Sequence, residues 1–352
     1  MRLALNLGYL SSWNPAADRL ALAREADRLG LSAVWVAEAY GSDAATLLAW
    51  LAAQTERIDL GSAIFQIPAR TPTMTAMTAA TLDLLSGGRF RLGLGVSGPQ
   101  VSEGWYGVRF ARPLARTREY VEVVRTALDR GTVRYAGEFH TLPLPDGPGK
   151  PLKLLLQQPP REHVPIYLAA IGPKNLELAG ELTDGVLAVF FAPESAADQL
   201  ACIATGRAKA KDGRTMDGFD VVANVPLVIG DDVATSADPV RPYTALYLGG
   251  MGSREKNFYN DLAVRMGYGD AAREVQVLYL ARRHRDAAAA VPLEFIDRTS
   301  LLGSVDRVAD RMRAYADAGV TTLSVAIHAG GTEESLQQLR LAVEAFEKSG
   351  LA

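Results

Sequence analysis

The chain has 352 residues and a formal net charge of -3, and 48% of its residues are hydrophobic while 22% are charged. These proportions are typical of soluble proteins. The single cysteine, Cys202, excludes a disulfide framework and a cysteine-based metal cluster. The slightly acidic balance argues against a nucleic-acid scaffold, and no run of about 18 apolar residues predicts a membrane-spanning helix. The N-terminus lacks a charged lead and a long apolar stretch, so we expect no signal peptide and a cytoplasmic protein.

Short apolar or β-branched segments alternate with longer segments of helical periodicity along most of the chain. The predicted strands span residues 2–7, 33–37, 58–64, 90–95, 166–170, 186–190, 221–228 and 322–327. The predicted helices span residues 16–29, 43–55, 72–85, 114–128, 174–182, 196–209, 304 or 306 to 318, and 333–348. Asp43 and Pro72 are residues typical of helix starts, and Gly30 and Gly319 of helix ends.

Two regions interrupt the alternation. Residues 131–164 are rich in Pro and Gly and predict a hairpin or irregular excursion after the fourth unit, and residues 231–300 predict a mostly helical insertion after the seventh strand. Eight successive strand-then-helix units favour an α/β fold of the (β/α)8 TIM-barrel type over an open doubly wound sheet. A minimal barrel needs roughly 250 residues, so these two regions hold the surplus. No linker divides residues 1–352, which we interpret as a single domain.

In such a barrel the active site lies at the C-terminal ends of the strands. The residues that follow the predicted strands are apolar and aromatic, with scattered hydroxyls and one clear carboxylate, Glu38. The four histidines are scattered and no Gly-x-Ser-x-Gly motif occurs, so we expect neither a metal site nor a serine nucleophile. A site of this kind suits chemistry supplied by a bound flat cofactor.

Two glycine-containing turns follow predicted strands. Residues 93–98 (Gly-Leu-Gly-Val-Ser-Gly) approximate a dinucleotide-binding fingerprint with one spacer fewer, but Pro99 follows instead of a clear helix. This context favours glycines that let a barrel strand pass close to a ligand or neighbour. In the second turn, Gly172 offers a free amide, Pro173 suits a first helical turn and Lys174 adds a cation. That pattern indicates either a phosphate site at a helix N-terminus or an ordinary turn between strand and helix.

A longer pattern runs through the chain in order. Its most specific segment is Leu-Ser-Gly-Gly-Arg-Phe-Arg-Leu-Gly-Leu-Gly at residues 85–95. The other matching segments span residues 25–30, 34–38, 55–61, 69–72, 169–173, 184–185 and 319–323. Together these segments resemble the luciferase-like, coenzyme F420-dependent oxidoreductases, which are relatives of bacterial luciferase.

The resemblance implies a barrel that binds an 8-hydroxy-5-deazaflavin, coenzyme F420, with flavin mononucleotide (FMN) as the alternative. It also implies a non-prolyl cis peptide between Ala63 and Ile64 behind the deazaflavin ring, and a phosphate held by backbone amides after the fifth strand. The coenzyme-binding residues predicted in this way are Ala63, Ile64, Ser97, Gly98, Ala170, Ile171, Gly172 and Lys174.

The same resemblance places Glu38 beside the ring and the substrate. We predict Glu38 and Tyr9 as the catalytic residues, with the identity of the proton donor open among Tyr, Ser, Glu and water. Residues near the predicted strand ends and in the insertion are expected to line the substrate pocket: Trp13, Tyr40 and Met251.

The chain departs from the alcohol and sugar-phosphate dehydrogenases of this family in two places. Ala39 stands where those enzymes tend to carry a histidine after the acid, and residues 97–99 (Ser-Gly-Pro) stand where they carry a catalytic glutamate. An alcohol oxidation needs a base to take the hydroxyl proton, whereas a reduction needs only a proton donor. The departures therefore favour a reductase.

The leading hypothesis is an F420-dependent oxidoreductase that moves a hydride between the deazaflavin and a small organic molecule. The alternatives are an FMN-dependent luciferase-like monooxygenase and a non-catalytic flavin-binding protein. The expected partners are a small-molecule substrate and a second copy of the chain in a homodimer, since dimers are common in the family and among soluble proteins. We expect no nucleic-acid or membrane partner.

Overall fold

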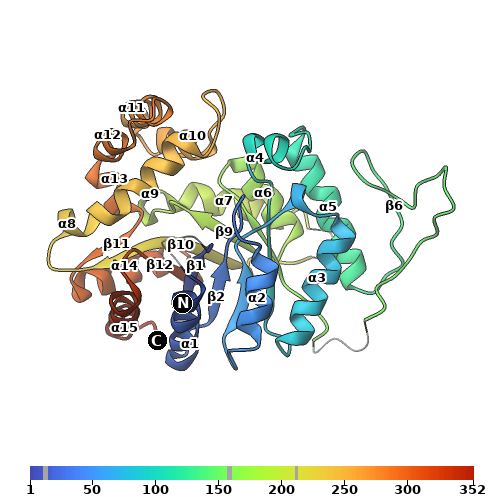
Figure 1. The fold of residues 1–352 in the computed structure, drawn as a ribbon, viewed down its shortest axis with the longest axis horizontal. Coiled ribbons are helices and arrows are strands. Elements are labelled where there is room, and N and C mark those ends of the chain that lie inside the picture. Colours follow the sequence, from blue (N-terminus) through green and yellow to red (C-terminus); the bar gives the residue numbers. More distant parts are fainter. Residues whose placement is uncertain (11–14, 157–160, 211–212) are drawn as a thin grey trace.

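The computed structural model describes residues 1–10, 15–156, 161–210 and 213–352. Eight parallel strands within these residues close into a barrel, because β10 pairs with β9 on one side and with β12 on the other (Figure 1). The strands in barrel order are β1 (Arg2–Gly8), β2 (Ala33–Val36), β3 (Asp59–Ser62), β5 (Phe90–Gly95), β8 (Ile166–Ala169), β9 (Gly185–Val189), β10 (Asp220–Ile229) and β12 (Thr322–Ile327). The predicted TIM-barrel fold is confirmed.

The helices that pack around the barrel begin and end close to the predicted positions. They are α1 (Ala16–Leu29), α2 (Ala44–Ala52), α3 (Pro72–Leu85), α5 (Pro113–Leu128), α6 (Pro173–Leu182), α7 (Ala196–Arg207), α14 (Val305–Asp317) and α15 (Thr332–Lys348). The predicted caps explain the boundaries. The Asp43 carboxylate accepts the Thr46 backbone N–H at 2.7 Å, and Gly30 ends α1 at a φ of 80°, which glycine adopts without strain. None of the helices in the described ranges combines the length and apolarity that crossing a bilayer requires.

The third barrel strand is shorter than predicted. β3 ends at Ser62, the peptide between Ala63 and Ile64 is cis, and β4 (Phe65–Gln66) resumes pairing with β5. The predicted cis peptide is confirmed. A Cβ atom on Gly93 would lie 1.9 Å from the Ser62 carbonyl oxygen, and one on Gly95 would lie 2.8 Å from the Ile64 side chain. These glycines therefore let β5 pass close to a neighbouring strand, as the barrel interpretation predicts.

Several short elements were not predicted, and two of them adjoin barrel strands. Helix α4 (Pro99–Gly104) follows β5 directly, although the sequence analysis expected no clear helix there. Pro99 occupies its first turn, where a missing N–H costs nothing. The strand β11 (Leu301–Gly303) pairs with the end of β10, and its three residues are too few for a periodic signal.

The two predicted additions to the barrel are present. The hairpin of β6 (Tyr135–Ala136) and β7 (Thr141–Leu142) lies in the excursion, which extends away from the barrel in Figure 1. The insertion forms the helices α8 (Val233–Ala237), α9 (Arg241–Ala245), α10 (Phe258–Arg265), α11 (Gly269–Leu280), α12 (His284–Ala289) and α13 (Leu293–Arg298), with the π-helix η4 (Leu246–Gly250). The insertion has its own core, which includes Leu248, Val275 and Phe295. Phe190 and Leu302 belong to the same core and fix the insertion to the barrel.

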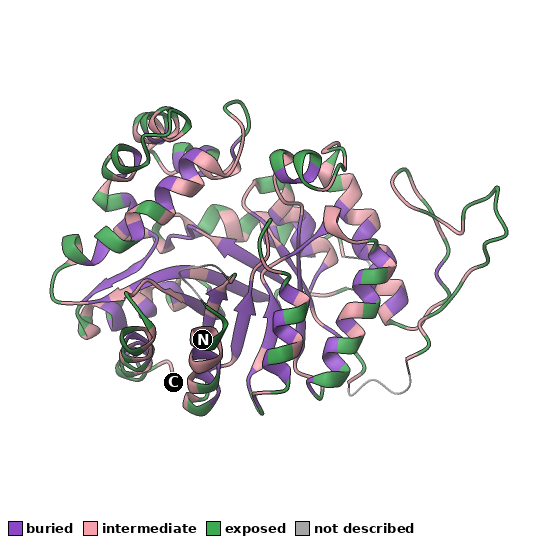
Figure 2. Cartoon of the chain, viewed as in Figure 1, coloured by how far each residue is buried: buried purple, intermediate pink, exposed green. Residues whose placement is uncertain are grey.

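The largest core lies between the strands and the surrounding helices, and the buried faces of these helices point inward (Figure 2). A smaller cluster fills the barrel interior: Ala4, Ala33, Trp35, Tyr167, Leu187 and Val222. Gly61 makes room for the largest of these side chains, since a Cβ atom there would lie 2.3 Å from the Trp35 ring. The interior is therefore a packed core and not a pore.

The N-terminal end of the barrel is closed by a polar network, which we call the floor. It consists of Arg2, Asp59, Arg91, Tyr167, Asp220, Thr321 and Thr322. Asp220 Oδ2 accepts hydrogen bonds from Tyr167 at 3.0 Å and from Arg91 at 3.2 Å, and Oδ1 accepts from Thr322 at 2.7 Å. Because the buried Arg91 also pairs with Asp59 at 2.7 Å, each charge in the floor has partners.

Candidate active site

The C-terminal ends of the barrel strands, which we call the mouth, lie at the end of the molecule that carries the insertion and α4 (Figure 1). Two residues just past strand ends have left-handed backbone conformations, Ser97 after β5 with a φ of 59° and Phe190 after β9 with a φ of 50°. Such conformations cost of order 1–3 kcal/mol each for residues other than glycine, and they gather at functional sites. Ser97 and Phe190 thus place two such conformations at the end of the barrel where TIM-barrel active sites lie.

Glu38 lies in the mouth, and both of its carboxylate oxygens have partners within the protein. Its side chain is only 5% exposed and forms a two-pronged ion pair with Arg70, in which the Nη2–Oε2 distance is 3.0 Å. Its two oxygens also accept the backbone N–H groups of Ala44 and Gln66, each at 3.1 Å. Glu38 therefore fixes the start of α2 and the end of β4. This geometry favours a positioning role, and a catalytic role for Glu38 stays a prediction.

Gln66 connects Glu38 to the loop after β5, because its backbone N–H donates to Glu38 and its side chain accepts a bond from Ser97. Its side chain is buried; Nε2 donates to the Ala39 carbonyl at 2.6 Å, and Oε1 accepts the Ser97 hydroxyl proton at 3.0 Å. Ser97 thus uses its proton within the protein and keeps lone pairs on Oγ as acceptors. Gly98 precedes α4, and the nearest atom to a Cβ there would be in the Gln100 side chain, at 2.5 Å.

The turn after β8, residues 170–173, is where the sequence predicts the phosphate site, and we call it the phosphate turn. Gly172 caps α6, a helix of 10 residues, and its carbonyl accepts the N–H groups of Asn175 at 3.0 Å and Leu176 at 2.9 Å. The amide of Ala170 donates to the Leu187 carbonyl at 3.3 Å, so it belongs to the sheet, which differs from the expectation that it faces the phosphate. The amides of Ile171 and Gly172 have no hydrogen-bond partner in the described ranges.

The cations around this turn differ from the predicted set. Lys174 is 78% exposed and pairs with Glu177 at 3.0 Å, one turn further along α6. Arg265, at the end of α10, donates to the Ile171 carbonyl at 3.4 Å. Arg265 stands 94 residues from Ile171 in the chain, and no local sequence signal links the two. The insertion thus brings to the turn a cation that the sequence analysis missed.

Three further predicted residues, Tyr9, Tyr40 and Met251, follow β1, β2 and η4. Tyr9, after β1, is 39% exposed, and Tyr40, after β2, is 62% exposed. Burial, reinforced by the neighbouring Tyr40, raises the pKa of Tyr9, so its hydroxyl keeps its proton at neutral pH. Met251 is half-buried after η4, where its N–H donates to the Leu246 carbonyl at 3.0 Å. Trp13 lies outside the described residues.

A group of aromatic rings that the sequence analysis did not assign to the site lies over the end of β9. The Phe190 ring centroid lies 5.8 Å from that of Tyr243, 5.6 Å from Tyr247 and 6.2 Å from Tyr259. The Tyr243 and Tyr247 centroids are 4.6 Å apart, and those of Tyr247 and Tyr259 are 4.7 Å apart. We call Tyr243, Tyr247 and Tyr259 the tyrosine cluster. Tyr243 and Tyr247 stand four residues apart, which is a detectable helical spacing.

His328, after β12, borders this cluster, with its ring 5.3 Å from that of Tyr243 in an edge-on arrangement. Burial lowers the pKa of His328 to about 4, although a hydrogen bond to the Pro239 backbone opposes the shift. The imidazole is therefore neutral at pH 7 and packs as a structural residue.

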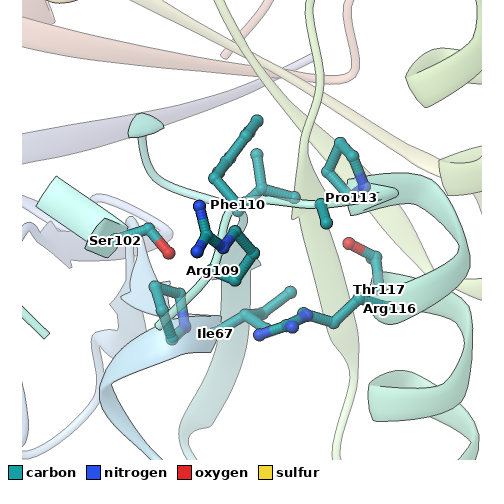
Figure 3. Close-up of a pocket in the computed structure, with 10 residues that line it drawn as sticks. Ile67, Ser102, Arg109, Phe110, Pro113, Arg116 and Thr117 are labelled. Atoms are coloured by element: carbon teal, nitrogen blue, oxygen red, sulfur yellow. The ribbon is translucent and has the colours of Figure 1, made fainter. Parts of the chain in front are cut away.

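A small cavity lies beside the mouth, between the loop after β5 and the start of α5 (Figure 3). Ile67, Ser102, Phe110 and Thr117 contribute to its lining, and its free volume of about 10 Å³ corresponds to one water molecule. The Thr117 hydroxyl is buried without a hydrogen-bond partner, which such a water would satisfy. No group of three His, Cys, Asp or Glu side chains suited to a metal ion occurs in the part of the chain described.

Comparison with known proteins agrees with this architecture. The family model "Luciferase-like monooxygenase" matches residues 4–322. The chain is 44% identical to a "Putative coenzyme F420-dependent oxidoreductase" of Mycobacterium tuberculosis, over 95% of this chain and 96% of the relative. It is 31% identical to a 5,10-methylenetetrahydromethanopterin reductase of Archaeoglobus fulgidus, over 84% and 85% of the two chains.

A solved structure has the same fold. The coenzyme F420-dependent tetrahydromethanopterin reductase of Methanopyrus kandleri superposes with a TM-score of 0.79 over 98% of each chain, at 23% sequence identity. The family model covers most of the sequence, and the two relatives match it over more than four-fifths of its length. The chain therefore belongs to the luciferase-like monooxygenase family of enzymes.

Proposed function

We propose that this enzyme is a coenzyme F420-dependent oxidoreductase that acts as a reductase on a small organic substrate. The observation that carries the proposal is the 44% identity, over 95% of the chain, to a relative named for coenzyme F420. When bound, the deazaflavin exchanges hydride, that is two electrons and one proton, with a carbon atom of the substrate. All other roles fall to residues of this chain.

The phosphate turn fits the coenzyme's phosphate. The free amides of Ile171 and Gly172 lie at the N-terminus of α6, where helix dipoles favour an anion, and Arg265 adds a nearby cation. A Cβ atom on Gly172 would meet no other atom within 4 Å, so the space next to the turn is open. These residues would hold the phosphate.

Unpaired polar atoms at the mouth end of the barrel interior support binding of the polar edge of the deazaflavin ring. Asn224 on β10 and Ser324 on β12 are register partners, and they share a strand face with the interior residue Val222 and its register partner Thr322. Asn224 Oδ1, Ser324 Oγ and the Trp35 indole nitrogen are buried without hydrogen-bond partners. Unpaired buried polar atoms cost about 1–3 kcal/mol each. The N–H and C=O groups of a pyrimidine edge would satisfy them.

The proposal that the enzyme acts as a reductase rests on which groups near the mouth can accept or donate a proton. Glu38 is held by Arg70 and by two backbone amides, and Ala39 stands beside it. Ser97 donates its proton to Gln66 and keeps acceptor lone pairs, but a neutral hydroxyl is too weak a base for this step. Tyrosine hydroxyls, in contrast, are abundant and protonated, and they suit proton donation in a reduction. The 31% identical relative is itself named a reductase.

The test is to follow the absorbance of reduced coenzyme F420 as it is mixed with the enzyme and candidate carbonyl compounds, with and without oxygen. A reductase oxidises the coenzyme at the same rate in both cases, because oxygen is not a reactant. The alternative, an FMN-dependent monooxygenase, is favoured by the family description, and it would turn over reduced FMN only when oxygen is present.

We also propose that the enzyme is a homodimer that associates through α2 and α3. Helix α2 has no charged residue, and the only one in α3, Asp83, is 1% exposed. Their outer faces instead carry large exposed apolar side chains: Trp50, Met74, Met77, Leu84 and Leu85. In a two-fold dimer a surface meets its own copy, so an uncharged apolar face gains contact without repulsion.

The variant Met77→Glu tests the dimer. Since it puts a charge in the middle of the face, opposite its own copy, we expect the parent to have the light-scattering mass of a dimer and the variant that of a monomer. Val277→Glu is the matched control, because Val277 is similarly exposed, at 55%, but lies on α11. A variant mass equal to that of the parent contradicts the proposed interface.

A further inference from the structure

We propose that the substrate carries a carboxylate, and that the cleft between α4 and the segment before α10 binds it. In this assignment Lys256 and Ser253 bind the carboxylate, and Phe110 packs against the apolar body of the molecule. The assignment rests on the proposed function, since it names the substrate class and a binding site for it. It adds charge recognition to the sequence prediction, in which the substrate pocket held Trp13, Tyr40 and Met251.

The cleft lies at the mouth end of the barrel, between α4 and residues 251–257, which join η4 to α10 (Figure 1). Its lining begins at Pro99, two positions after Ser97 in the loop that follows β5. Its free volume of about 420 Å³ falls within the range of about 300–1,000 Å³ that is typical of small-molecule sites. The cleft therefore has room for a small organic molecule next to the residues that we predict to bind the coenzyme.

One side of the cleft offers an aromatic surface that the backbone holds in place. The N–H of Phe110 donates to Glu103 Oε1 at 2.9 Å, which fixes the end of the loop after α4. The half-buried Phe110 ring lies with its centroid 6.4 Å from that of Phe258, the first residue of α10. The apolar part of a ligand would gain contact with this ring.

The other side of the cleft is a tight turn. The N–H of Ser253 donates to the Lys256 carbonyl at 3.0 Å, and the N–H of Lys256 donates to Ser253 Oγ at 3.1 Å. A Cβ atom on Gly252 would lie 2.5 Å from the Lys256 carbonyl oxygen, so glycine permits this close approach. The buried Asn257 side chain donates to the Leu248 carbonyl at 3.0 Å and ties the turn to η4. The backbone that carries Ser253 and Lys256 is therefore held in a defined position.

Two hydrogen-bond donors that line the cleft are unused within the described residues. The Lys256 ammonium lies 5.3 Å from the centroid of the Phe110 ring and has no hydrogen bond or ion pair there. Ser253 Oγ accepts the Lys256 N–H, and its own proton has no acceptor in the same part of the chain. A cation and a hydroxyl proton that line one cleft suit an anionic oxygen group.

The charges around the cleft favour a carboxylate over a phosphate. Among the described residues that line it, Lys256 is the only cation and Glu103 is the only anion. Arg109 lies 3.9 Å from Glu103 and offsets part of its charge. The single charge of a carboxylate is balanced by Lys256, whereas the second charge of a phosphate would have no cation in the cleft and would be repelled by Glu103.

Benzoate is the first probe, because it has a carboxylate on an apolar ring and no group that the enzyme could reduce. In ligand-observed NMR titrations of the purified enzyme, we expect benzoate to bind the parent and Lys256→Met to weaken that binding about fivefold, the upper range for an exposed ion pair. Benzamide, the uncharged analogue, should bind the parent and Lys256→Met equally. Phe110→Ala should weaken both ligands, because it removes the aromatic surface.

Arg254→Met is the matched control, because it removes an exposed cation from the same turn that does not line the cleft. It should bind benzoate like the parent. Equal benzoate affinity in the parent and in Lys256→Met contradicts the assignment, as does failure of benzoate to bind the parent.

The second probe is a pair of aldehydes, 4-carboxybenzaldehyde and its uncharged methyl ester. With reduced coenzyme F420, the parent should favour the acid about fivefold in kcat/KM, and Lys256→Met should remove that preference. A parent that reduces both aldehydes equally well contradicts the assignment alone. An enzyme that binds benzoate through Lys256 but does not bind coenzyme F420 supports the carboxylate site and contradicts the proposed function.

Discussion

Buried polar groups have hydrogen-bond partners at the floor of the barrel, whereas several toward the mouth lack them. In the floor, Asp220 accepts bonds from Arg91, Tyr167 and Thr322, and each of these groups has a partner. Further along the same strands, four residues after Asp220 and two after Thr322, Asn224 and Ser324 have buried oxygen atoms without partners. A satisfied buried network stabilises the fold, whereas unsatisfied buried groups are costly and are kept where a ligand completes them. The floor therefore stabilises the fold, whereas the unpaired atoms toward the mouth support the coenzyme site proposed above.

The largest effect is expected in the floor. Asp220→Ala leaves the buried Arg91 with less compensation, so we expect a loss of about 3–5 kcal/mol in the free energy of unfolding. Urea denaturation measures it. The control Asp310→Ala removes an exposed partner of Arg313 and should cost less than about 1 kcal/mol. Equal losses in the free energy of unfolding for the two variants would contradict a large contribution of the floor to stability.

The next effect is expected at the phosphate turn. Gly172→Asp puts a carboxylate at the N-terminus of α6, where the proposal requires the coenzyme's phosphate, and should weaken coenzyme F420 at least about tenfold in a fluorescence titration. The space beside Gly172 is open, so the fold should tolerate the change. Gly172→Ser, which adds a side chain without charge, is the control. If both variants bind like the parent, the phosphate lies elsewhere.

His328, near the mouth, and Asp184, near the floor, should change the free energy of unfolding in different pH ranges. The lowered pKa of His328, about 4 against 6.5, means that the unfolded chain binds more protons between these values. Stability should therefore be full above pH 6.5 and fall as pH drops toward 4, and His328→Gln should flatten that slope. Asp184, which precedes β9 near the floor, has its pKa lowered by its hydrogen bond with His163 and its ion pair with Arg125, despite opposing burial. Its contribution should be lost only at pH values below its ordinary pKa of about 4. Urea titrations at several pH values measure both.

The smallest effect is expected inside the barrel. Asn224→Leu replaces a side chain whose buried amide oxygen has no partner by an apolar one of similar size, so the free energy of unfolding without coenzyme should stay the same or rise. Coenzyme affinity should fall by about 1 kcal/mol, or about fivefold, the value of one hydrogen bond. A loss of stability without a loss of coenzyme affinity would mean that Asn224, like Asp220, stabilises the fold and does not bind the coenzyme.

Much of the fold was predictable because its signals are local. The bounds of α1 and β5 match the prediction residue for residue, since Gly30 ends one and the surrounding turns bound the other. The barrel followed from counting eight alternating units, and the cis peptide at Ala63 from the family resemblance. What was missed, β11 and α4, is too short to produce a periodic pattern.

The site was less predictable because its contacts are not local. The position of Glu38 was predicted, but its pairing with Arg70, 32 residues away, depends on how two strand ends meet. Arg265 reaches the phosphate turn only because the insertion folds back over the barrel. Tyr243 and Tyr247 have a helical spacing that the sequence shows, but their approach to Phe190 is set by tertiary packing. Spacing within one helix cannot predict such a contact.

The most direct test of the central claim is a pair of fluorescence titrations of the purified enzyme, one with oxidised coenzyme F420 and one with FMN. The account predicts saturable binding of coenzyme F420 and much weaker binding of FMN, with Gly172→Asp weakening the former. Tight binding of FMN with no binding of coenzyme F420 would contradict it.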